Sequence, residues 1–170
     1  VVIPSEIRVD GHVYPVTSIE YRAFYGCYDM TNIEIPSSVT SIGDSAFRDC
    51  GGLTSINVSR DNSIYSSEDG ILYDKNKTTL VLVPVGKKGS VVLLSGVTCI
   101  GDNACSGCRN LTSIEIPKSV TNIGNGAFRG CESLTSITIP NSITTIGDYA
   151  FSGCESLIIQ CNPGSYAEKY

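Results

Sequence analysis

Residues 111–133 read LTSIEIPKSVTNIGNGAFRGCES, and residues 134–156 read LTSITIPNSITTIGDYAFSGCES. The two units have the same length, 23 residues, and 16 of the 23 positions are identical. A repeat of this period is typical of a solenoid, because one short unit cannot bury its own apolar face and must stack on a neighbour. The sequence therefore predicts a stack of coils whose function lies on an extended surface, not in a single cleft.

Related units fill most of the remaining chain. Residues 30–52 read MTNIEIPSSVTSIGDSAFRDCGG, which is another complete unit. We expect a single repeat domain over residues 1–170, with about six coils when the partial ends are counted. Its expected segments are a partial repeat at 1–29, a repeat at 30–52, an irregular repeat with an insertion at 53–89, repeats at 90–110, 111–133 and 134–156, and a partial C-terminal repeat or cap at 157–170.

Each unit begins with an alternating stretch. Ile33 and Ile35 alternate with Asn32 and Glu34, which predicts a strand with one buried face. Pro36 ends this strand, because proline has no N–H to donate to a continuing ladder. Successive strands should pair and expose a continuous row of polar side chains.

The second part of the unit, V-T-S-I-G, predicts another short extended piece with Val39 and Ile42 inward. We expect the glycine that follows to adopt a backbone conformation that is costly for other residues. One helical turn should then insert Ala46 and Phe47 into the core. The glycine position holds Gly43, Gly101, Gly124 and Gly147, and the expected N-cap position holds Asp44, Asp102 and Asp148.

Residues 53–89 interrupt the repeat. Residues 71–73 and 79–83 are strand-like, and residues 74–77 join them with turn-forming side chains. This arrangement predicts a β-hairpin that replaces the far side of one coil.

The orientation of this hairpin sets which side chains a partner can reach. If Val81 and Val83 face inward, Leu80 and Leu82 face outward or lie under a neighbouring strand. Leu80 and Leu82 are therefore candidate hairpin contacts for a partner.

The two ends carry local signals. Asp10-Gly11 lies between two extended stretches and predicts a hairpin. Residues 165–168, Ser-Tyr-Ala-Glu, have the form of a capping box and predict the start of a helix that covers the end of the stack. Residues 2–5 resemble the strand ending at residues 114–119, so we expect a mature or trimmed fragment of a longer protein.

The composition argues against two kinds of partner. The net charge is −5 and 17% of the residues are charged, whereas a nucleic-acid-binding protein normally carries a basic face. No apolar run reaches the roughly 18 residues that a membrane-spanning helix needs. We expect no nucleic acid, no membrane span and no cofactor, and the start of the chain lacks the basic region of a signal peptide.

Eight cysteines would be consistent with disulfides in a small secreted protein. Five of them, however, share one repeat position. Because a free cysteine packs as a small hydrophobe, we predict that this column consists of buried free thiols. The column contains Cys27, Cys50, Cys108, Cys131 and Cys154.

The repeat unit L-T-S-I-x-I-P-x-S-V-T-x-I-G-x-x-A-F-x-G-C closely resembles the BspA-like, or treponemal-type, leucine-rich repeats. The resemblance covers nearly the whole chain, including the insertion and the ending GSYAEKY. It implies a β-rich, right-handed parallel solenoid with short helical turns. It also implies a secreted or cell-surface bacterial-type protein that acts in adhesion or host-protein binding, without shared catalytic residues.

Residues 105–108 form a C-x-x-C motif that has several interpretations. It can be a redox pair or half of a zinc site, or the two thiols can form a local disulfide. Zinc would need two further ligands, and the chain has no second C-x-x-C motif. We favour two buried thiols, with Cys105 in the position of a phenylalanine and Cys108 in the cysteine column, and we keep the disulfide as the alternative.

The remaining candidates for chemistry are weaker. His12 is the single histidine, so any histidine-dependent catalytic system must use it, but its place beside a turn indicates a solvated residue. A cluster of Asp61, Asp69, Asp74, Asn62 and Asn76 does not have the spacing of a calcium loop and is better explained by turn chemistry. Lys75, Lys77, Lys87 and Lys88 either dock a partner or keep the hairpin soluble.

The best candidate for a functional surface is the outward row of the I-x-I strands. Neighbouring strands should lie about 4.8 Å apart and give one polar face, and solenoids commonly bind partners on such faces. The row contains Asn32, Glu34, Ser55, Asn57, Ser113, Glu115, Ser136 and Thr138.

We therefore predict a non-enzymatic module that recognises a protein of the host or of a neighbouring cell. The alternatives are a structural spacer that displays another domain and a glycan-binding module. The absence of tryptophan weakens the glycan alternative, although nine tyrosines remain. A hydrolase would need a group of catalytic residues that the sequence does not contain.

Overall fold

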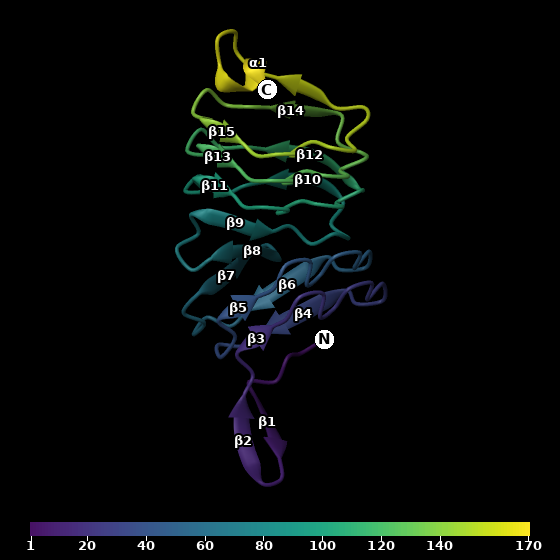
Figure 1. Ribbon diagram of the computed structural model, residues 1–170, viewed down its shortest axis with the longest axis vertical. Helices are drawn as coiled ribbons and strands as arrows, with labels where there is room; N and C mark the ends of the chain where they lie inside the picture. Colours follow the sequence, from purple (N-terminus) through teal and green to yellow (C-terminus); the bar gives the residue numbers. More distant parts are fainter.

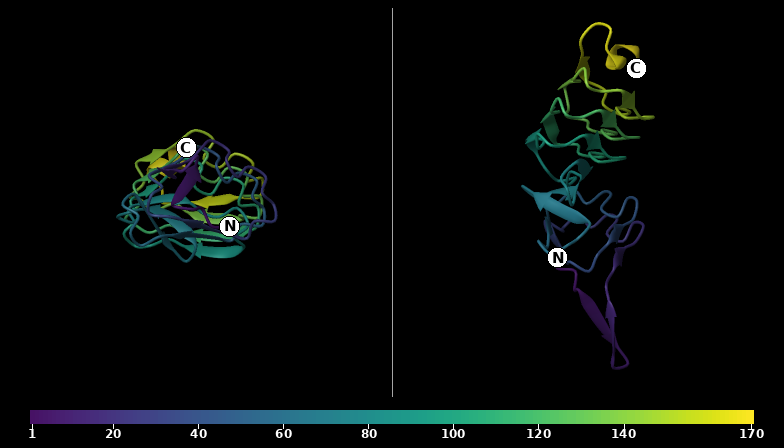
Figure 2. Two further views of the ribbon diagram at one scale, coloured as in Figure 1. Left: turned by 90° about the horizontal axis from the view of Figure 1, so that it is seen from below. Right: turned by 90° about the vertical axis from the view of Figure 1, so that its left-hand side faces the viewer.

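The computed structural model describes all 170 residues, which form a β-solenoid of about six coils stacked along one long axis (Figure 1). The C terminus lies at one end of the stack, and a hairpin projects from the other end (Figures 1 and 2). The predicted β-rich repeat solenoid is confirmed. The one helix has four residues, and no helix of the chain is long and apolar enough to cross a membrane.

Two columns of strands run along the stack. The long strands contain the I-x-I segment or its counterpart and are β4 (Asn32–Ile35), β6 (Ser55–Val58), β10 (Gly89–Val92), β12 (Leu111–Glu115), β14 (Ser136–Thr138) and β16 (Ile158–Gln160). The short strands are β3 (Ser18–Ile19), β5 (Ser41–Ile42), β11 (Cys99–Ile100), β13 (Asn122–Ile123) and β15 (Thr145–Ile146).

The insertion and the ends supply the other elements. The insertion holds β7 (Tyr65–Glu68), β8 (Ile71–Asp74) and β9 (Thr79–Leu82), and the ends hold β1 (Glu6–Val9), β2 (His12–Pro15) and α1 (Tyr166–Lys169). The antiparallel pairs β1–β2 and β8–β9 confirm both predicted hairpins. β7 pairs with β8 and is a third strand of the insertion, which was not predicted from the sequence.

The repeat period sets the strand register. β4 and β6 pair in parallel, with Ile33 opposite Ile56, and both side chains are fully buried. In β4, β6, β12 and β14 the isoleucine is inward and its polar neighbour outward, as the sequence predicts, whereas β10 has Val91 inward and the last strand, β16, is exposed. Pro36 follows β4 directly, so the strand ends where the backbone donor is lost.

The insertion divides the hydrophobic core into two clusters. One contains 25 buried residues and extends from the insertion to the C-terminal coils, and the other contains 12 and fills the N-terminal coils. Strand β8 is buried on both faces and contributes to both: Ile71 and Tyr73 belong to the larger cluster, whereas Leu72 belongs to the smaller. β8 is therefore a wall between two cores.

Both strand columns break at this wall. The short-strand column continues from β15 through β13, β11 and β9 into the insertion as one six-stranded sheet, but β3 and β5 form a separate pair. In the long-strand column, β4 pairs with β6, and β10 with β12, without a ladder between β6 and β10. The molecule thus has an N-terminal half and a C-terminal half that are joined by the insertion.

The glycines after the short strands differ from the expectation. None of Gly43, Gly101, Gly124 and Gly147 has a positive φ. A Cβ atom at Gly147 would instead lie 2.5 Å from the backbone nitrogen of Asn125 in the preceding coil. The position requires glycine because two coils approach closely there, and the positive φ falls two residues later, for example at Ser45 (57°) and Tyr149 (56°).

The segments after these glycines form hydrogen-bonded turns, so the predicted helical turn and its N-cap are wrong. Ala46 and Phe47 are nevertheless buried, as expected. The side chain at the supposed N-cap position bonds to the next coil: Asp102 Oδ1 accepts from the Asn125 N–H at 2.7 Å. Asn125 Oδ1 in turn accepts from the Asp148 N–H at 2.8 Å.

The C-terminal helix is present, but its capping differs in detail. Ser165 is the N-cap residue and its side chain makes no capping hydrogen bond. Glu168 accepts a hydrogen bond from the Gly164 N–H at 2.5 Å, one residue before the position in a regular capping box. Tyr170 packs edge-on against Phe151 at 6.0 Å between ring centroids, so the last residues cover the end of the stack.

Candidate binding surface

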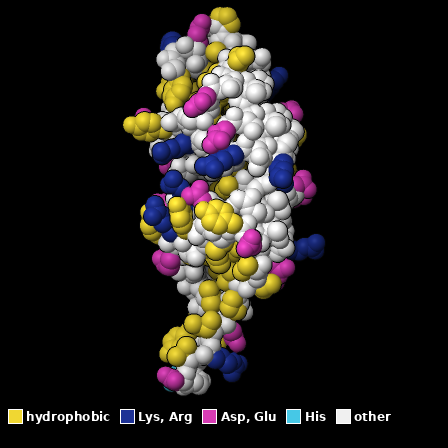
Figure 3. All heavy atoms as spheres, turned by 90° about the vertical axis from the view of Figure 1, so that its right-hand side faces the viewer, with side chains coloured by type: hydrophobic (Ala, Val, Ile, Leu, Met, Phe, Trp, Pro, Cys, Tyr) yellow, Lys and Arg dark blue, Asp and Glu magenta, His cyan; other side chains and the backbone are white.

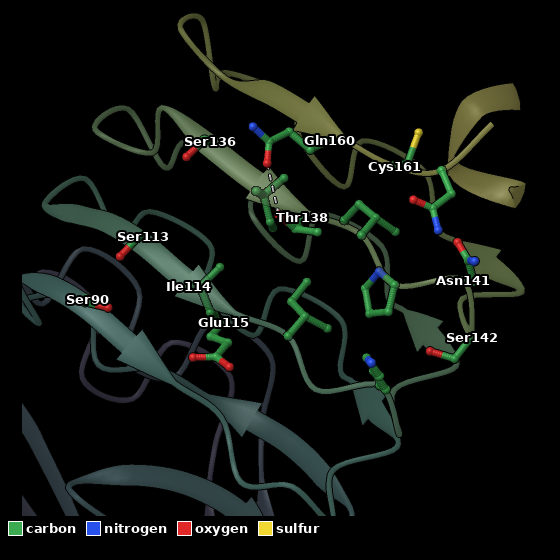
Figure 4. A pocket seen from close by; sticks show the side chains of 16 residues that line it. Ser90, Ser113, Ile114, Glu115, Ser136, Thr138, Asn141, Ser142, Gln160 and Cys161 are labelled. Carbon is green, nitrogen blue, oxygen red and sulfur yellow. Dashed lines mark hydrogen bonds between the residues drawn. The ribbon is translucent and has the colours of Figure 1, made fainter.

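A groove lies along the long strands of the C-terminal half. It has a volume of about 930 Å³ and runs over β10, β12, β14 and β16 (Figure 4). We call it the sheet-face groove. Its polar side chains are Ser90, Ser113, Glu115, Lys118, Ser136, Thr138, Asn141, Ser142, Gln160 and Asn162.

The strand alternation places these side chains in the groove. Ile114 and Ile137 are buried, so their neighbours along each strand must point outward. In Figure 4, Ser113 on β12 and Ser136 and Thr138 on the adjacent strand β14 lie on the same side of the sheet. The groove therefore presents a surface of small hydroxyl groups with one carboxylate, from Glu115, and one ammonium group, from Lys118.

Few of these groups bond to one another. Thr138 donates a hydrogen bond from Oγ1 to Gln160 Oε1 at 3.1 Å. The side chains of Ser113, Glu115 and Ser136 make no hydrogen bond within the chain. They can therefore bond to a partner without breaking an internal contact.

The other half of the predicted row lies elsewhere. Asn32, Glu34, Ser55 and Asn57 lie on β4 and β6, opposite one another in register, and none of them lines the sheet-face groove. Ser55 Oγ donates to Asn57 Oδ1 at 3.3 Å, so part of this patch is bonded internally. The break at the insertion splits the predicted row into two separate patches.

Two residues at the edges of the groove were not predicted from the sequence. Ser90 is opposite Ser113 in the β10–β12 pair, and Gln160 is opposite Thr138 in the β14–β16 pair. Both lie in strands that depart from the L-T-S-I-x-I pattern. Extending the polar columns by one coil in each direction would have identified them.

The expected orientation of the insertion hairpin is wrong at Leu80. β9 pairs in parallel with β11 and places Leu80 opposite the buried Ile100, so Leu80 also points into the core and is fully buried. A partner cannot reach it. Leu82 is half-buried and packs against the N-terminal core.

The cysteine column is only partly buried. Cys50, Cys108 and Cys131 are buried, Cys154 is half-buried, and Cys27 is exposed in the first coil. All eight cysteines are free, including Cys105 and Cys108 of the C-x-x-C motif. Burial raises the pKa of Cys105 well above its ordinary value and the pKa of Cys108 to about 12, so both stay protonated and unreactive near neutral pH.

The other candidates for chemistry have local structural roles. His12 is exposed at the start of β2, and no group of three His, Cys, Asp or Glu side chains lies close enough together to hold a metal ion. Asn62 is fully buried and donates to the carbonyl oxygens of Pro36 and Val39 at 2.9 and 2.8 Å.

The lysines of the insertion also bond within the chain. Lys75 donates to the carbonyl oxygen of Arg60 at 2.9 Å, and Lys87 donates to that of Asp69 at 2.6 Å. These bonds tie the insertion together.

The pattern of these coils matches a known repeat family. A family model described as a BspA type leucine-rich repeat region matches residues 13–85 and 87–165 with six copies. No curated protein matches the chain.

Solved structures of bacterial proteins share the fold. A leucine-rich repeat protein from Eubacterium ventriosum is 34% identical, with a TM-score of 0.79 over 89% of this chain and 41% of that chain. A leucine rich cell surface protein from Faecalibacterium prausnitzii is 27% identical, with a TM-score of 0.54 over 94% of this chain and 46% of that chain. The pneumococcal vaccine antigen PcpA is 24% identical, with a TM-score of 0.66 over 85% of this chain and 42% of that chain, and this likeness concerns the fold alone.

This chain spans less than half the length of each of these three proteins. The match of the family model over most of the chain agrees with the 23-residue strand register and with the stacked coils. The chain therefore belongs to the BspA type leucine-rich repeat family.

Proposed function

We propose that this chain is a non-enzymatic protein-recognition module of a secreted or cell-surface bacterial-type protein. In this proposal the sheet-face groove binds a protein of the host or of a neighbouring cell. The observation that carries it is the row of Ser113, Glu115 and Ser136, which line one groove and have no hydrogen-bond partner within the chain.

The size and chemistry of the groove support a protein partner. It extends over four neighbouring strands with a volume of about 930 Å³, which gives room for an extended polypeptide segment. Hydroxyl groups can donate and accept, so they can bond to the alternating N–H and C=O groups of a polypeptide. Serine and threonine side chains also lose less conformational freedom on binding than long side chains do.

The lining of the groove favours a protein over a glycan. None of its 16 lining residues is aromatic, so the groove offers no ring on which a sugar can stack. The exposed tyrosines Tyr21, Tyr25 and Tyr28 lie in the first coil, away from the groove.

A cell-surface location is supported by one relative. The similar protein from Faecalibacterium prausnitzii is described as a cell surface protein. Recognition of external proteins by an extended solenoid face is consistent with such a location. We restrict the proposed contact surface to the groove, because the patch of Asn32, Glu34, Ser55 and Asn57 is separated from it by the insertion.

A binding array of purified extracellular matrix and surface proteins tests the proposal. The purified chain is compared with the variants Thr138→Trp, in the groove, and Asn57→Trp, at the equivalent strand position in the N-terminal half. Both positions are exposed in the structure. We expect a partner that binds the wild-type chain and Asn57→Trp but loses affinity for Thr138→Trp.

Two outcomes would contradict the proposal. A partner that is indifferent to Thr138→Trp would place the contact outside the groove. Absence of any partner across the array would favour a structural spacer that displays another domain.

A further inference from the structure

The turn loops of successive coils are joined by a ladder of main-chain hydrogen bonds. We define a turn loop as the segment from the glycine after a short strand to the next column cysteine, such as residues 101–108 and 124–131. Alternate N–H groups of each loop donate to carbonyl oxygens of the loop in the following coil. Between these two loops the bonds are Asn103 to Asn125 (2.8 Å), Cys105 to Ala127 (2.7 Å) and Gly107 to Arg129 (2.7 Å).

The ladder stops at the insertion because the insertion has no turn loop. The N–H groups of Ser45, Phe47 and Asp49, which hold the donating positions of the loop below, have no hydrogen-bond partner in the chain. The carbonyl oxygens of Asp102 and Ser106 in the loop above also have none. The two loops that face the insertion, residues 43–50 below and 101–108 above, therefore carry unpaired main-chain groups, except that the Ala104 oxygen between Asp102 and Ser106 accepts from Val83.

A gap lies between these two loops. In place of a turn loop, the chain crosses through residues 83–86. The Val83 N–H donates upward to the Ala104 oxygen at 2.7 Å, and the Gly86 N–H donates downward to the Leu53 oxygen at 2.7 Å. Because the same short segment bonds to both neighbouring coils, the missing loop leaves a space for one turn loop.

This space is a cleft of about 330 Å³ that is lined by residues of both loops and of the chain around the crossing segment. We call it the loop slot. Its accessible apolar surface comes from Val81, Leu82 and Val85, whereas Leu72 and Phe47 are buried beneath it. The loop slot thus has an apolar floor between two turn loops that carry unpaired main-chain hydrogen-bonding groups.

The charges that line the loop slot nearly cancel: the upper side carries two carboxylates and two guanidinium groups, and the lower side carries two carboxylates and one guanidinium group. On the lower side, Arg48 Nε lies 3.7 Å from Asp49 Oδ2, and on the upper side, Arg109 Nε lies 3.2 Å from Glu132 Oε1. Acidic and basic side chains lie next to one another across the middle of this face of the molecule (Figure 3). The slot therefore does not favour a strongly charged ligand.

We propose that the loop slot binds a segment of a partner polypeptide in the place of the missing turn loop. Carbonyl oxygens of the segment accept from the N–H groups of Ser45, Phe47 and Asp49, and its own N–H groups donate to the oxygens of Asp102 and Ser106. An apolar side chain of the segment covers the floor. The occupant is a polypeptide because the unpaired N–H groups of the lower loop and the unpaired oxygens of the upper loop need acceptors and donors that alternate along one chain.

A synthetic peptide with the sequence of a turn loop is a suitable probe. The peptide GNGAFRG, residues 124–130 with blocked ends, is added to the ¹⁵N-labelled protein and followed by NMR. We expect saturable shift changes around the slot and slower hydrogen exchange at the amides of Ser45, Phe47 and Asp49. A control peptide with Phe128→Ser should bind more weakly, because it loses the side chain that covers the floor.

A matched pair of protein variants locates the binding. Ser106→Trp fills the slot, whereas Ser152→Trp carries the same change at the same loop position in the last coil, outside the slot. We expect Ser106→Trp to weaken peptide binding at least about tenfold and Ser152→Trp to leave it unchanged. The exchange measurement on the wild-type protein supplies a test that does not depend on the folding of either variant.

Several results would overturn the assignment. Failure of the peptide to bind at millimolar concentration, or binding without protection of the three amides, would remove the slot as a peptide site. Equal binding by both tryptophan variants would do the same. A wild-type dimer that Ser106→Trp abolishes would instead assign the slot to a second copy of this chain.

Discussion

The C-terminal half and the insertion solve the same packing problem in different ways. From residue 90 to residue 156 each coil places apolar side chains at the same inward positions, although Cys105 stands where the next two coils have phenylalanine, so the core is continuous. After β6, residues up to Leu82 replace the rest of one coil with three antiparallel strands, of which β8 is buried on both faces. A regular coil extends a core, whereas this insertion ends one core and starts another.

An inserted hairpin can thus carry the stack although it continues only the short-strand ladder of the C-terminal half. The strand columns and the turn loops both break at the insertion. Hydrophobic contacts on the two faces of β8, together with hydrogen bonds such as those of Val83 to Ala104 and Gly86 to Leu53, hold the halves together. Four kinds of substitution test this difference, and their expected effects on stability decrease in the order given below. They lie in the regular coils, in β8, at a close approach of two coils, and at an ion pair of the insertion.

Truncation of the regular core should have the largest effect. Phe128 is fully buried and stacks on Phe151 at 5.4 Å between ring centroids. We expect Phe128→Ala to lower the free energy of unfolding by about 3–5 kcal/mol, because it leaves a cavity among tightly packed side chains. Chemical denaturation measures this loss of stability. As a control, Phe151→Ala, at a half-buried ring, should lower the free energy of unfolding by less. A larger loss for Phe151→Ala than for Phe128→Ala would contradict the stacking scheme.

The wall should separate the effects of adjacent substitutions. Leu72→Ala removes a side chain from the N-terminal core, and Ile71→Ala removes one from the C-terminal core. We expect each to cost about 2–5 kcal/mol. Native-state hydrogen exchange should show lost protection in the N-terminal coils for Leu72→Ala and in the C-terminal coils for Ile71→Ala. Identical exchange patterns would mean that the two cores behave as one.

Close approach of coils should make Gly147 intolerant of a Cβ atom. The added carbon at Gly147 would lie 2.5 Å from the backbone nitrogen of Asn125, whereas a Cβ atom added at Gly96 would have no neighbour within 4 Å. We expect Gly147→Ala to cost about 1–3 kcal/mol and Gly96→Ala to be close to neutral. Thermal unfolding of the two variants measures the difference, and equal melting temperatures would contradict the explanation by close approach.

The smallest effect should come from the exposed ion pair of the insertion. A hydrogen bond from Lys77 to Glu68, at 2.6 Å, lowers the pKa of Glu68. The folded pKa is depressed, so the stabilisation is present above the unfolded pKa and is lost as the pH falls through the folded pKa. In an NMR titration, Lys77→Gln should raise the pKa of Glu68, whereas the control Lys88→Gln should leave it unchanged. An unchanged pKa of Glu68 in Lys77→Gln would show that the ion pair is not formed in solution.

The regular coils could be predicted from the sequence because each side chain has an equivalent one period away. Ile33 and Phe47 take the buried positions that their columns indicate. The insertion has no such comparison. Local alternation alone predicts an outward Leu80, but the orientation of this side chain depends on the register with β11, which the local sequence does not contain.

One further feature, the β7–β8 turn, could have been predicted from the sequence, and another, the division of the polar row, could not. Asp69-Gly70 is the same dipeptide as the hairpin turn Asp10-Gly11, and both pairs have positive φ angles, so the β7–β8 turn had a recognisable signal. The division of the polar row into a groove and a separate patch had no recognisable signal in the sequence. It results from a strand that is buried on both faces, and alternation cannot identify such a strand.

The turn-loop ladder also gives the stack an electrical direction. Every rung of this ladder points its N–H toward the C-terminal end and its carbonyl toward the N-terminal end. Aligned peptide dipoles add, as they do in a helix. The column of turn loops is therefore positive at its C-terminal end and negative at its N-terminal end, and the insertion cuts it into two shorter dipoles that face each other with opposite poles.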